Sequence, residues 1–576
     1  MQTIGTLGKY TFQHLLENSV KLFTLRPAVS FVGEQPITYA QFYEKVKQTQ
    51  KLLTNVGIKA GDHVAILSPS SPFWGITYFA IVLMGCVAVP LLHDFSDEEV
   101  ASCIAHSGAK ALFVTDKMQT KMKDTSSLTA VINIEDGSLF KGEITNDEDV
   151  MPHICGEQDL ASIIYTSGTT GRSKGVMLTH KNLVFTAIAG QEAQRINCYD
   201  CALSILPMSH VYEFTIGFVM FILNGACIYY LGGPPVPRTL LPALAKVRPH
   251  FMLVVPMVIE KIYKQKIAPA LNASSFMRFL CAHKITRSLV LRKAGKKLVK
   301  SFGGRLKFFG IGGAKLDPNV EQFMKEAHFP YSVGYGLTET SPLVIYSAVG
   351  KTRVGFMGRC LQDVEVRLED VDVKTGVGEL VVKGANVMRG YYKDAEKTNA
   401  AFTKDGFFKT GDLCSIDEKG WVSLMGRSKN VIVGSSGENI YPEDIEFVIN
   451  KHPFVTESLV IEGENSSLVA YVKLDDEKVE AEVKRESSKT FTESLQEGMT
   501  EFSEAMTEAA LYKKEELLNE IKFFINNNVN RMSRIDTVQV VDEFAKTASQ
   551  KIKRYLYSIT KSNKHLNDNA EIDAQD

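Results

Sequence analysis

Short apolar runs alternate with segments of helical periodicity from about residue 28 to residue 345. The clearest runs read as buried strands, because both faces of a parallel strand are covered and its sequence stays apolar throughout. They are HVAILSP (63–69), ALFVTD (111–116), FMLVVP (251–256) and, late in the chain, SLVAYVKL (467–474). Strands that alternate with helices predict an α/β fold, with largely parallel sheets packed with helices.

Two apolar stretches are long enough to imitate membrane spans. Residues 73–92 (FWGITYFAIVLMGCVAVPLL) contain no charged side chain, and residues 214–232 repeat the same plan. About 20 apolar residues suffice to cross a bilayer. However, Gly85 and Pro90 interrupt the first stretch, and Asn224-Gly225 interrupts the second. We therefore interpret both as buried helix–turn–strand units.

The pattern changes in the last third of the chain. Residues 353–427 contain short β runs separated by turns, which indicates a β-rich subdomain. A compact α+β segment follows, whose helix begins with Pro442 and acidic residues, both favourable in a first turn. We expect a large domain over 1–427 and a small domain over 428–560. A helical insertion at about 475–526 and a disordered tail at 561–576 complete the prediction.

Length, charge and cysteine usage restrict the function. A chain of 576 residues is too long for one core, and its net charge of −1 gives no reason to expect nucleic acid as a partner. Nine scattered cysteines indicate a reducing compartment, and the N-terminal residues lack a signal-peptide pattern. We expect a cytoplasmic protein. The pair Cys198 and Cys201 has no second ligand pair, so we interpret it as ordinary cysteines rather than a zinc site.

Residues 261–307 form a basic segment without an acidic side chain. Its basic residues are Lys261, Lys264, Lys266, Arg278, Lys284, Arg287, Arg292, Lys293, Lys296, Lys297, Lys300, Arg305 and Lys307. One interpretation is a peripheral contact with the anionic inner face of a membrane, where each basic residue contributes about 1 kcal/mol. The other is a solvated helical face whose charge is balanced by acids elsewhere. The sequence leaves both interpretations open.

The stretch IIYTSGTTGRSKGVMLTH (163–180) combines glycines, hydroxyl groups and a lysine behind a short apolar run. Glycines let the backbone approach an anion, amide N–H groups form a concave anion site, and lysine adds a point charge. A Walker A loop needs lysine directly after glycine, whereas Arg172 and Ser173 separate Gly171 from Lys174 here. The spacing excludes a Walker A NTPase and leaves a phosphate-binding loop or an ordinary turn.

Four further segments of the chain favour a phosphate-binding loop over an ordinary turn. They are GYGLTETSP (334–342), TGDL (410–413), GRSKNVIVGSSGENIYPEDIE (426–446) and KTASQKIKRYL (546–556). With the loop, in this order and spacing, they resemble the adenylate-forming superfamily of acyl-CoA synthetases, luciferases and non-ribosomal peptide adenylation domains. The resemblance extends from about residue 12 to residue 557. Long-chain fatty acid–CoA ligases are most similar, through LPMSHVYEFTIG (206–217), the basic stretch before KFFGIGGAKLD (307–317) and RMSRIDTVQVVDEFAKT (531–547).

The resemblance implies a two-step reaction that uses ATP, Mg²⁺ and coenzyme A. A carboxylate, with a long-chain fatty acid favoured, attacks the α-phosphate of ATP to give acyl-AMP and pyrophosphate. The thiol of coenzyme A then displaces AMP to form a thioester. In this reading, residues 1–427 form the AMP-binding adenylation domain, and residues 428–560 form a mobile domain that swings between the two half-reactions.

Individual roles follow from the resemblance as well. Thr338 is expected to bond the α-phosphate, and Glu339 to hold Mg²⁺, a hard cation suited to carboxylate and phosphate oxygens. Asp412 should accept hydrogen bonds from the ribose hydroxyls, assisted by Arg427. His210 corresponds to a position beside the acyl pocket. The residues expected to bind the nucleotide are Thr166, Ser167, Gly168, Thr169, Thr170, Gly171, Lys174, Gly313, Ala314, Tyr335, Gly336, Asp412 and Arg427.

Lys551 is the expected catalytic lysine, because an ammonium group near the α-phosphate and the attacking carboxylate favours the transition state. It lies in a basic tail with Lys546, Lys553 and Arg554, so one more surface cation is the alternative. The family pattern has glycine before this lysine, whereas Gln550 stands here, so the loop must take a different turn. Lys429 matches the hinge of the mobile domain.

Two other functions remain open at this point. The first is an adenylation enzyme that loads an acyl group onto a separate carrier protein. The second is a nucleotide-binding regulatory module without catalysis, against which Glu339, Asp412, Arg427 and Lys551 argue. Glu213 could meet a substrate amino group, but a pocket for fatty acids would not need it.

Overall fold

The chain folds into two compact units in a computed structural model. The first unit comprises Met1–Thr410 and Ser415–Leu424, and the second comprises Gly411–Cys414 and Met425–Asp576. The structure describes residues 8–122, 124–144, 150, 153–166, 173–433, 439–463, 467–479, 516–547 and 552–557. The predicted tail at 561–576 and most of the predicted insertion, residues 480–515, lie outside the described residues.

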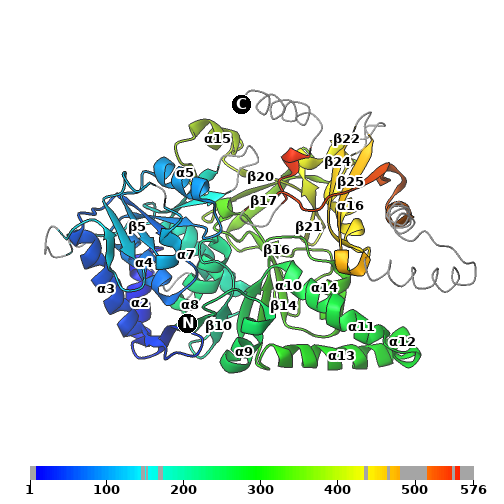
Figure 1. The fold of residues 1–576 in the computed structure, drawn as a ribbon, viewed down its shortest axis with the longest axis horizontal. Coiled ribbons are helices and arrows are strands. Elements are labelled where there is room, and N and C mark those ends of the chain that lie inside the picture. The colour runs from blue at the N-terminus through cyan, green and yellow to red at the C-terminus, as the bar shows by residue number, and fades with distance from the viewer. Residues whose placement is uncertain are drawn as a thin grey trace, which may run out of the picture. The chain divides into compact units, whose positions relative to one another are not determined.

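A nine-stranded sheet forms the larger framework of the first unit (Figure 1). In spatial order its strands are β16 (Arg359–Cys360), β15 (Ile345–Tyr346), β14 (Tyr331–Tyr335), β13 (Phe308–Ile311), β12 (Phe251–Val254), β10 (Cys201–Ser204), β11 (Cys227–Tyr230), β1 (Pro27–Phe31) and β2 (Ile37–Thr38). The consecutive pairs from β14 to β1 are parallel. The predicted strand FMLVVP is therefore confirmed as the central strand β12.

A second, eight-stranded sheet belongs to the same unit. Its order is β19 (Gly390–Tyr391), β9 (Lys174–Thr179), β8 (Leu160–Thr166), β4 (Val87–Leu91), β3 (His63–Leu67), β5 (Ala111–Val114), β6 (Ala130–Asn133) and β7 (Leu139–Lys141). The strands from β8 to β6 pair in parallel, and β9 and β19 add antiparallel strands at one side. The α/β fold class with largely parallel sheets is confirmed.

Helices fill the space between these two sheets. The helix α4 (Pro72–Leu83) contacts β1 of the first sheet and both β3 and β4 of the second. Next to it, α7 (His180–Ala189) packs on β9, while the π-helical segment η2 (Glu213–Val219) packs on β10 and β12 and continues into α8 (Met220–Leu223). The two charge-free stretches are thus buried helix–turn–strand units, as predicted, because they have protein on every side.

Aromatic rings hold this inner layer together. Phe12 at the start of α2 (Phe12–Phe23) contacts the rings of Tyr78 and Phe79 on α4 and of Phe214 on η2. The rings of Tyr78 and Phe214 lie 4.2 Å apart, centroid to centroid. Offset and edge-on aromatic contacts of this kind contribute beyond the area that they bury.

Further helices cover the outer faces of the first unit. They are α3 (Tyr39–Asn55), α5 (Asp97–Ser107), α6 (Asp116–Gln119), α9 (Pro237–Val247), α10 (Pro256–Ile262), η3 (Tyr263–Ile267), α11 (Ala268–Asn272), α12 (Ser275–Ala282), α13 (Lys284–Ser301), α14 (Pro318–Glu326) and α15 (Ala395–Ala400). The predicted β-rich region forms a four-stranded sheet in the order β17 (Val364–Glu369), β18 (Gly378–Gly384), β20 (Phe408–Ile416) and β21 (Val422–Arg427).

The second unit contains a small α+β arrangement. Strands β24 (Val455–Glu462), β25 (Leu468–Leu474) and β26 (Thr537–Val540) form a sheet, and the helix α16 (Pro442–Ile449) packs on β24. A two-stranded ribbon, β22 (Ile432–Val433) with β23 (Asn439–Ile440), precedes it. Residues 516–528 are helical, and Ile521 and Ile525 on this helix are fully buried. The predicted helix with Pro442 at its start is confirmed as α16.

All nine cysteines are free thiols, as expected of a chain without a disulfide framework. Among the described residues no helix is both long and apolar enough to cross a membrane.

Glu213 is a carboxyl group inside the apolar layer. The residue is 2% exposed, and its Oε2 atom has no hydrogen-bond partner. It borders a small cavity of about 10 Å³, the size of one water position, between η2 and the strands β10 and β12. Burial raises the pKa of Glu213 to about 8. The group is therefore uncharged at neutral pH.

We predict that Glu213 makes the stability of the chain pH-dependent. In the unfolded chain this carboxyl ionises near its ordinary pKa, so stability falls as the pH rises from about 5 towards 8. Glu213→Gln should flatten that fall, with a difference of up to roughly 4 kcal/mol, because one pKa unit equals about 1.36 kcal/mol. Thermal melts at both ends of this range measure it. Glu44→Gln, at an exposed position, is the control, and equal pH slopes for wild type and Glu213→Gln would contradict the prediction.

Candidate active site

Most predicted site residues of the first unit follow the carboxyl ends of neighbouring parallel strands. His210 follows β10, Gly313 and Ala314 follow β13, and Gly336 follows β14. Because β10, β12, β13 and β14 run parallel, these ends lie along one edge of the nine-stranded sheet. In open α/β sheets, ligands bind in the crevice outside this edge.

The backbone at this edge has little space for side chains. Gly313 has a φ of +89°, in the left-handed region that favours glycine. A Cβ atom on Gly336 would lie 1.5 Å from the carbonyl oxygen of Pro342. Tyr335, just before Gly336, is 8% exposed at the end of β14. The segment GYGLTETSP is therefore folded tightly back on itself.

The turn η4 (Thr338–Thr340) carries the two predicted catalytic side chains of this segment. Thr340 anchors the turn, because its Oγ1 accepts from the amide of Leu337 at 2.9 Å and donates to the carbonyl of Pro342 at 2.8 Å. Thr338 and Glu339 are half-buried at its start. Their backbone position is thus fixed by a neighbour that is itself buried.

Tyr391 connects Glu339 to the second sheet. Its hydroxyl donates to Oε1 of Glu339 at 3.0 Å, and the amide of Met388 donates to the backbone carbonyl of Glu339 at 2.8 Å. Burial, reinforced by the Glu339 carboxylate, raises the pKa of Tyr391, so its hydroxyl keeps the proton that it donates. Tyr391 lies in β19, which pairs with β9 through Tyr391 and Val176.

Lys174 lies on the other side of the same tyrosine. Its Nζ atom is 4.9 Å from the centroid of the Tyr391 ring, a cation–π distance. Lys174 opens β9 and is directly paired with Thr166 at the end of β8. The hairpin of β8 and β9 therefore brings together the two ends of the predicted phosphate loop, while Ser167, Gly168, Thr169, Thr170 and Gly171 lie outside the described residues.

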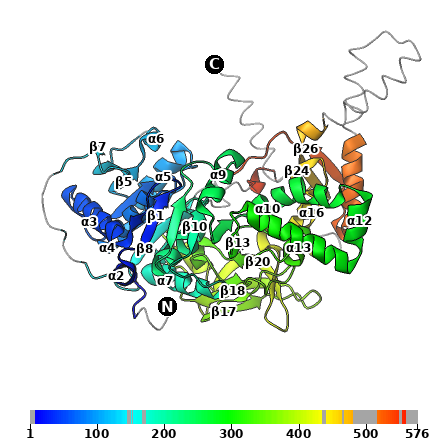
Figure 2. The same cartoon turned by 90° about the horizontal axis from the view of Figure 1, so that it is seen from below.

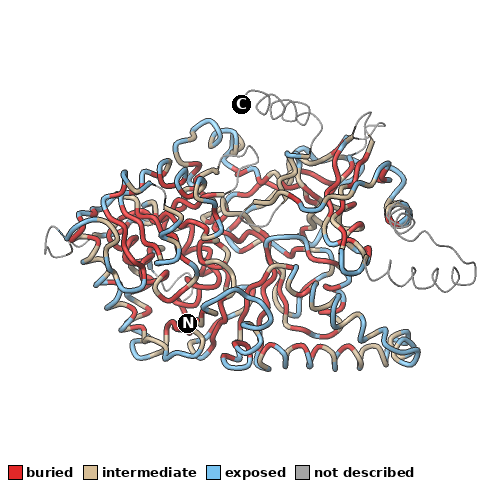
Figure 3. The backbone as a smooth tube through the Cα atoms, in the orientation of Figure 1, coloured by how far each residue is buried: buried red, intermediate tan, exposed pale blue. Residues whose placement is uncertain are grey.

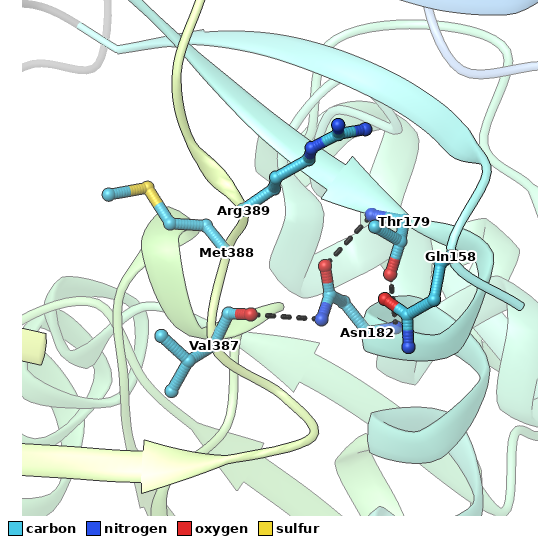
Figure 4. A pocket seen from close by; sticks show the side chains of 6 residues that line it. All are labelled: Gln158, Thr179, Asn182, Val387, Met388 and Arg389. Atoms are coloured by element: carbon cyan, nitrogen blue, oxygen red, sulfur yellow. Dashed lines mark hydrogen bonds between the residues drawn. The ribbon is translucent and has the colours of Figure 1, made fainter. Parts of the chain in front are cut away.

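A polar pocket of about 390 Å³ lies beside the segment that leads to Tyr391 (Figure 4). It is lined by Gln158, Thr179, Asn182, Val387, Met388 and Arg389. The amide nitrogen of Asn182 donates to the carbonyl oxygens of Ala385 and Val387 at 2.8 and 2.9 Å. Asn182 therefore ties the start of α7 to the segment before β19 and helps to set the position of Tyr391.

In the second unit, Asp412 and Arg427 form an ion pair. The Nε atom of Arg427 lies 2.9 Å from Oδ1 of Asp412, which is 3% exposed. Ser428 adds a hydrogen bond from its hydroxyl to the carbonyl of Gly411 at 3.2 Å. The two residues predicted to hold the ribose are thus brought together. Lys429 follows in the exposed turn η5 (Ser428–Asn430).

Lys551 and Gln550 lie outside the described residues, but the chain on both sides of them is anchored. Lys546 pairs with Ile552 in an antiparallel bridge, and its Nζ lies 2.7 Å from Glu457. Arg554 forms an ion pair with Glu446 at 2.6 Å. Two of the cations in the basic tail therefore serve structure, and Lys551 belongs to the short connection between them.

Sequence reasoning missed Tyr391 and Asn182. The only local signal for Tyr391 is the short run MRGYY (388–392), which follows the β-rich strand GELVVKG. The sequence around Tyr391 does not identify its partner, because Tyr391 and Glu339 are 52 positions apart. Tyr391 is on a strand of the eight-stranded sheet, and Glu339 is in the turn after β14 of the nine-stranded sheet. His210 is half-buried, and its place beside an acyl pocket stays a prediction. Glu213 is buried rather than placed to meet a charged amine.

The residues present fit a magnesium–nucleotide complex rather than a metal cage. Among the described residues there is no cluster of three or more histidine, cysteine or acidic side chains that could hold a metal ion. Glu339 supplies a single carboxylate, fixed by Tyr391 through one of its oxygens. Mg²⁺ typically binds in this manner, through one or two carboxylates together with phosphate oxygens and water.

Comparisons with known proteins agree with this arrangement. The sequence profile described as AMP-binding enzyme matches residues 16–392. The long-chain-fatty-acid–CoA ligase FadD15 of Mycobacterium bovis is 30% identical over 484 residues, which cover 77% of this chain and 78% of that protein. The putative acyl-CoA synthetase YngI of Bacillus subtilis is 28% identical, covering 81% and 88% of the two chains.

Solved structures show the same fold. The o-succinylbenzoate coenzyme A synthetase of Bacillus subtilis, in complex with ATP and magnesium ion, aligns with a TM-score of 0.72 at 20% identity, covering 94% of this chain and 98% of that chain. ATP-bound MatB from Rhodopseudomonas palustris aligns with a TM-score of 0.71 at 22% identity, covering 94% and 98%. The resemblance stated from the sequence motifs is confirmed. The chain belongs to the AMP-binding enzyme family and is an AMP-forming acid–thiol ligase.

Proposed function

We propose that this ligase activates a long-chain fatty acid as acyl-AMP and transfers the acyl group to coenzyme A. The observation that carries the proposal is the similarity, over 77% of the chain, to a protein named as a long-chain-fatty-acid–CoA ligase. A long-chain acid partitions into membranes, so a peripheral contact of the basic segment 261–307 with a lipid surface would bring the enzyme to its substrate. Transfer to a carrier protein is not favoured, since the relatives compared are named for coenzyme A.

In the first half-reaction, a carboxylate oxygen of the acid bonds to the α-phosphorus of ATP. The bond from this phosphorus to the oxygen that bridges to the β-phosphate breaks, and pyrophosphate leaves with the electron pair. Negative charge develops around the phosphoryl oxygens, so catalysis depends on positioned cations and hydrogen-bond donors. Thr338 donates to the α-phosphate, and Lys551 stabilises the charge that develops there.

The contacts around Tyr391 position the residues that bind the β- and γ-phosphates of ATP. Lys174 and the loop Thr166–Gly171 hold the β- and γ-phosphates, which become the leaving group. Glu339 would hold Mg²⁺, which when bound would neutralise charge on the phosphates. Support comes from the hydrogen bond that Tyr391 donates to Glu339 and from the position of Lys174 over the same ring. One tyrosine thereby sets the spacing between a cation for phosphate and a carboxylate for the metal.

Two further sets of residues are proposed to bind the nucleoside end of ATP. The adenine is flanked by Gly313, Ala314, Tyr335 and Gly336. The three small residues leave room for a flat ring, and Tyr335 offers an aromatic side chain beside it. Asp412 accepts hydrogen bonds from the ribose hydroxyls, with its orientation fixed by Arg427. In the second half-reaction, the sulfur of coenzyme A, as the thiolate, bonds to the acyl carbonyl carbon. The bond from this carbon to the phosphate oxygen breaks, and AMP leaves with the electron pair. His210 lies beside the acyl group.

We predict that pyrophosphate is released from ATP only with a suitable acid, and that release rises with chain length up to the long-chain range. Lys551→Ala should lower the rate roughly a hundredfold or more, because a positioned charge at the α-phosphate is lost. Lys553→Ala, a neighbouring cation, is the matched control. The assay measures pyrophosphate and AMP with acids of graded length, with and without coenzyme A. A preference for short or aromatic acids would contradict the proposal of a long-chain fatty acid as substrate. No pyrophosphate release with any acid would contradict the proposed adenylation reaction.

We predict that Tyr391→Phe weakens the use of magnesium without unfolding the chain. The variant removes only the hydroxyl that donates to Glu339, and a hydrogen bond to a charged group contributes about 1.5–3 kcal/mol. The first half-reaction should slow roughly tenfold to a hundredfold, and the Mg²⁺ concentration for half-maximal rate should rise. Tyr392→Phe, the adjacent tyrosine, should change neither quantity. An unchanged magnesium dependence of Tyr391→Phe would show that Glu339 does not rely on this contact.

We predict that Lys429→Pro separates the two half-reactions. Proline fixes φ and prevents the backbone rotation that a hinge requires. Adenylation, followed as pyrophosphate release in a single turnover, should stay near the wild-type rate, whereas thioester formation should stall. Lys429→Ala, which keeps backbone freedom, should form more thioester than the proline variant. Equal loss of both half-reactions in Lys429→Pro would contradict the hinge.

A further inference from the structure

The segment from α10 to α13 gathers exposed apolar side chains beside a dense positive charge. Its thirteen basic residues between positions 261 and 307 have no acidic residue among them, whereas the whole chain has a net charge of −1. In Figure 2, which views the molecule from below, α12 and α13 face the viewer. In Figure 3 the same segment, along the lower edge, is drawn mostly as intermediate or exposed.

The helix α12 has no buried residue at all. Its two phenylalanines, Phe276 and Phe279, are 68% and 59% exposed and lie one turn apart. Directly after it, Ile285 and Leu289 at the start of α13 are 80% and 64% exposed. Four large apolar side chains within two consecutive helices make a patch that water disfavours.

The two helices are held against each other at their junction, close to the exposed apolar residues. The hydroxyl of Thr286 on α13 donates to the carbonyl of Leu280 on α12 at 2.6 Å. The ring of Phe279 lies 4.5 Å from the ring of His283 at the junction between the helices, centroid to centroid. The apolar patch therefore lies at the corner where α12 meets α13.

One face of α13 continues this patch with lysines. The buried residues of the helix are Leu291, Gly295 and Leu298. With 3.6 residues per turn, the opposite face carries Ile285, Leu289, Lys293, Lys296 and Lys300. We call the four apolar residues of α12 and α13, together with this row of lysines and the adjacent exposed Lys297, the α12–α13 surface. Apolar groups occupy one end of it and positive charges the other.

The lysines of this surface are not neutralised by nearby acids. Arg287 and Lys307 form ion pairs at 2.7 Å with Glu326 and Asp200, and neither belongs to the row of lysines on α13. Among the described residues, no ion pair is found for Lys284, Arg292, Lys293, Lys296, Lys297 and Lys300. The alternative interpretation of the basic segment, a solvated face whose charge is balanced by nearby acids, therefore does not account for these six residues.

We propose that the α12–α13 surface docks on an anionic lipid bilayer. Basic side chains are attracted to the negative surface potential of such a membrane, and exposed aromatic and aliphatic side chains enter the boundary between headgroups and acyl chains. The combination of lysines and exposed apolar side chains favours a bilayer over the other partners. An acidic protein would explain only the lysines, and a second copy of the chain would explain only the apolar groups. An anionic lipid surface explains both. Long lysine side chains also reach from a helix to the headgroups while their stems stay apolar.

The test is co-sedimentation of the full chain with lipid vesicles, without acid, ATP or coenzyme A, so it does not depend on the proposed substrate. The chain should bind vesicles of phosphatidylcholine with phosphatidylglycerol at least about tenfold more tightly than vesicles of phosphatidylcholine alone. Added salt should weaken this binding, because it screens charges that lie outside the bilayer. No binding to the anionic vesicles would overturn the proposal.

Two variants test the two parts of the surface. Lys293→Glu, Lys296→Glu, Lys297→Glu and Lys300→Glu together should abolish the preference for anionic vesicles. Phe276→Ser, Phe279→Ser, Ile285→Ser and Leu289→Ser together should weaken binding at least about fivefold and leave the remainder sensitive to salt. All eight positions are exposed or on the solvent face, and thermal melts verify that both variants are folded.

A matched control carries the same change of net charge at exposed positions elsewhere in the first unit. It combines Lys45→Glu, Lys117→Glu, Lys404→Glu and Lys419→Glu. This control should bind vesicles like the wild type, and an equal loss in control and test variants would overturn the role of this surface. Light scattering measures the oligomeric state of the wild type and the variants. A dimer that the serine variant converts to a monomer would assign the surface to a second copy of the chain and would also overturn the proposal.

Discussion

The hydrogen bond from Tyr391 to Glu339 is the contact on which the arrangement of the first unit's site depends. It joins β19, an antiparallel strand at one side of the eight-stranded sheet, to the turn η4, which follows β14 of the nine-stranded sheet. Lys174 lies over the same ring, and the amide of Met388 holds the backbone of Glu339. Lys174 and Glu339, which we propose to meet phosphate and magnesium, are therefore both held against one buried side chain. A shift of one sheet relative to the other would break the contacts of Tyr391 with Glu339 and Lys174.

The inner helical layer explains why this contact can be kept. Helices α4, α7 and η2 lie between the two sheets, with aromatic rings that interlock between them. Because α4 and the residues of η2 after Glu213 meet protein on every face, their sequences carry no charge and resemble membrane spans. Glu213 is the exception inside this layer, and burial keeps its carboxyl protonated. The cost of this one polar group is small beside the apolar area that the layer removes from water.

The fold class could be predicted from the sequence because its signals are local. Runs such as HVAILSP and FMLVVP are β3 and β12, and Gly85 and Asn224-Gly225 mark the turns that separate helix from strand. Site residues carried by compact motifs, such as Glu339 and Asp412, could be named from the resemblance. Tyr391 and Asn182 could not, because their roles arise from partners that only the folded chain brings near. The exposed patch at Phe276 and Ile285 was also beyond the sequence, since periodicity on a short helix does not say which face lacks a neighbour.

The central claim is that Tyr391 acts through Glu339. The most direct test is a double-mutant cycle of Tyr391→Phe and Glu339→Gln, measured as ATP–pyrophosphate exchange at limiting Mg²⁺. If the tyrosine serves only to position the carboxylate, the double variant should lose little more activity than Glu339→Gln alone. If the two losses multiply as independent effects, the contact does not organise the site and the account is wrong.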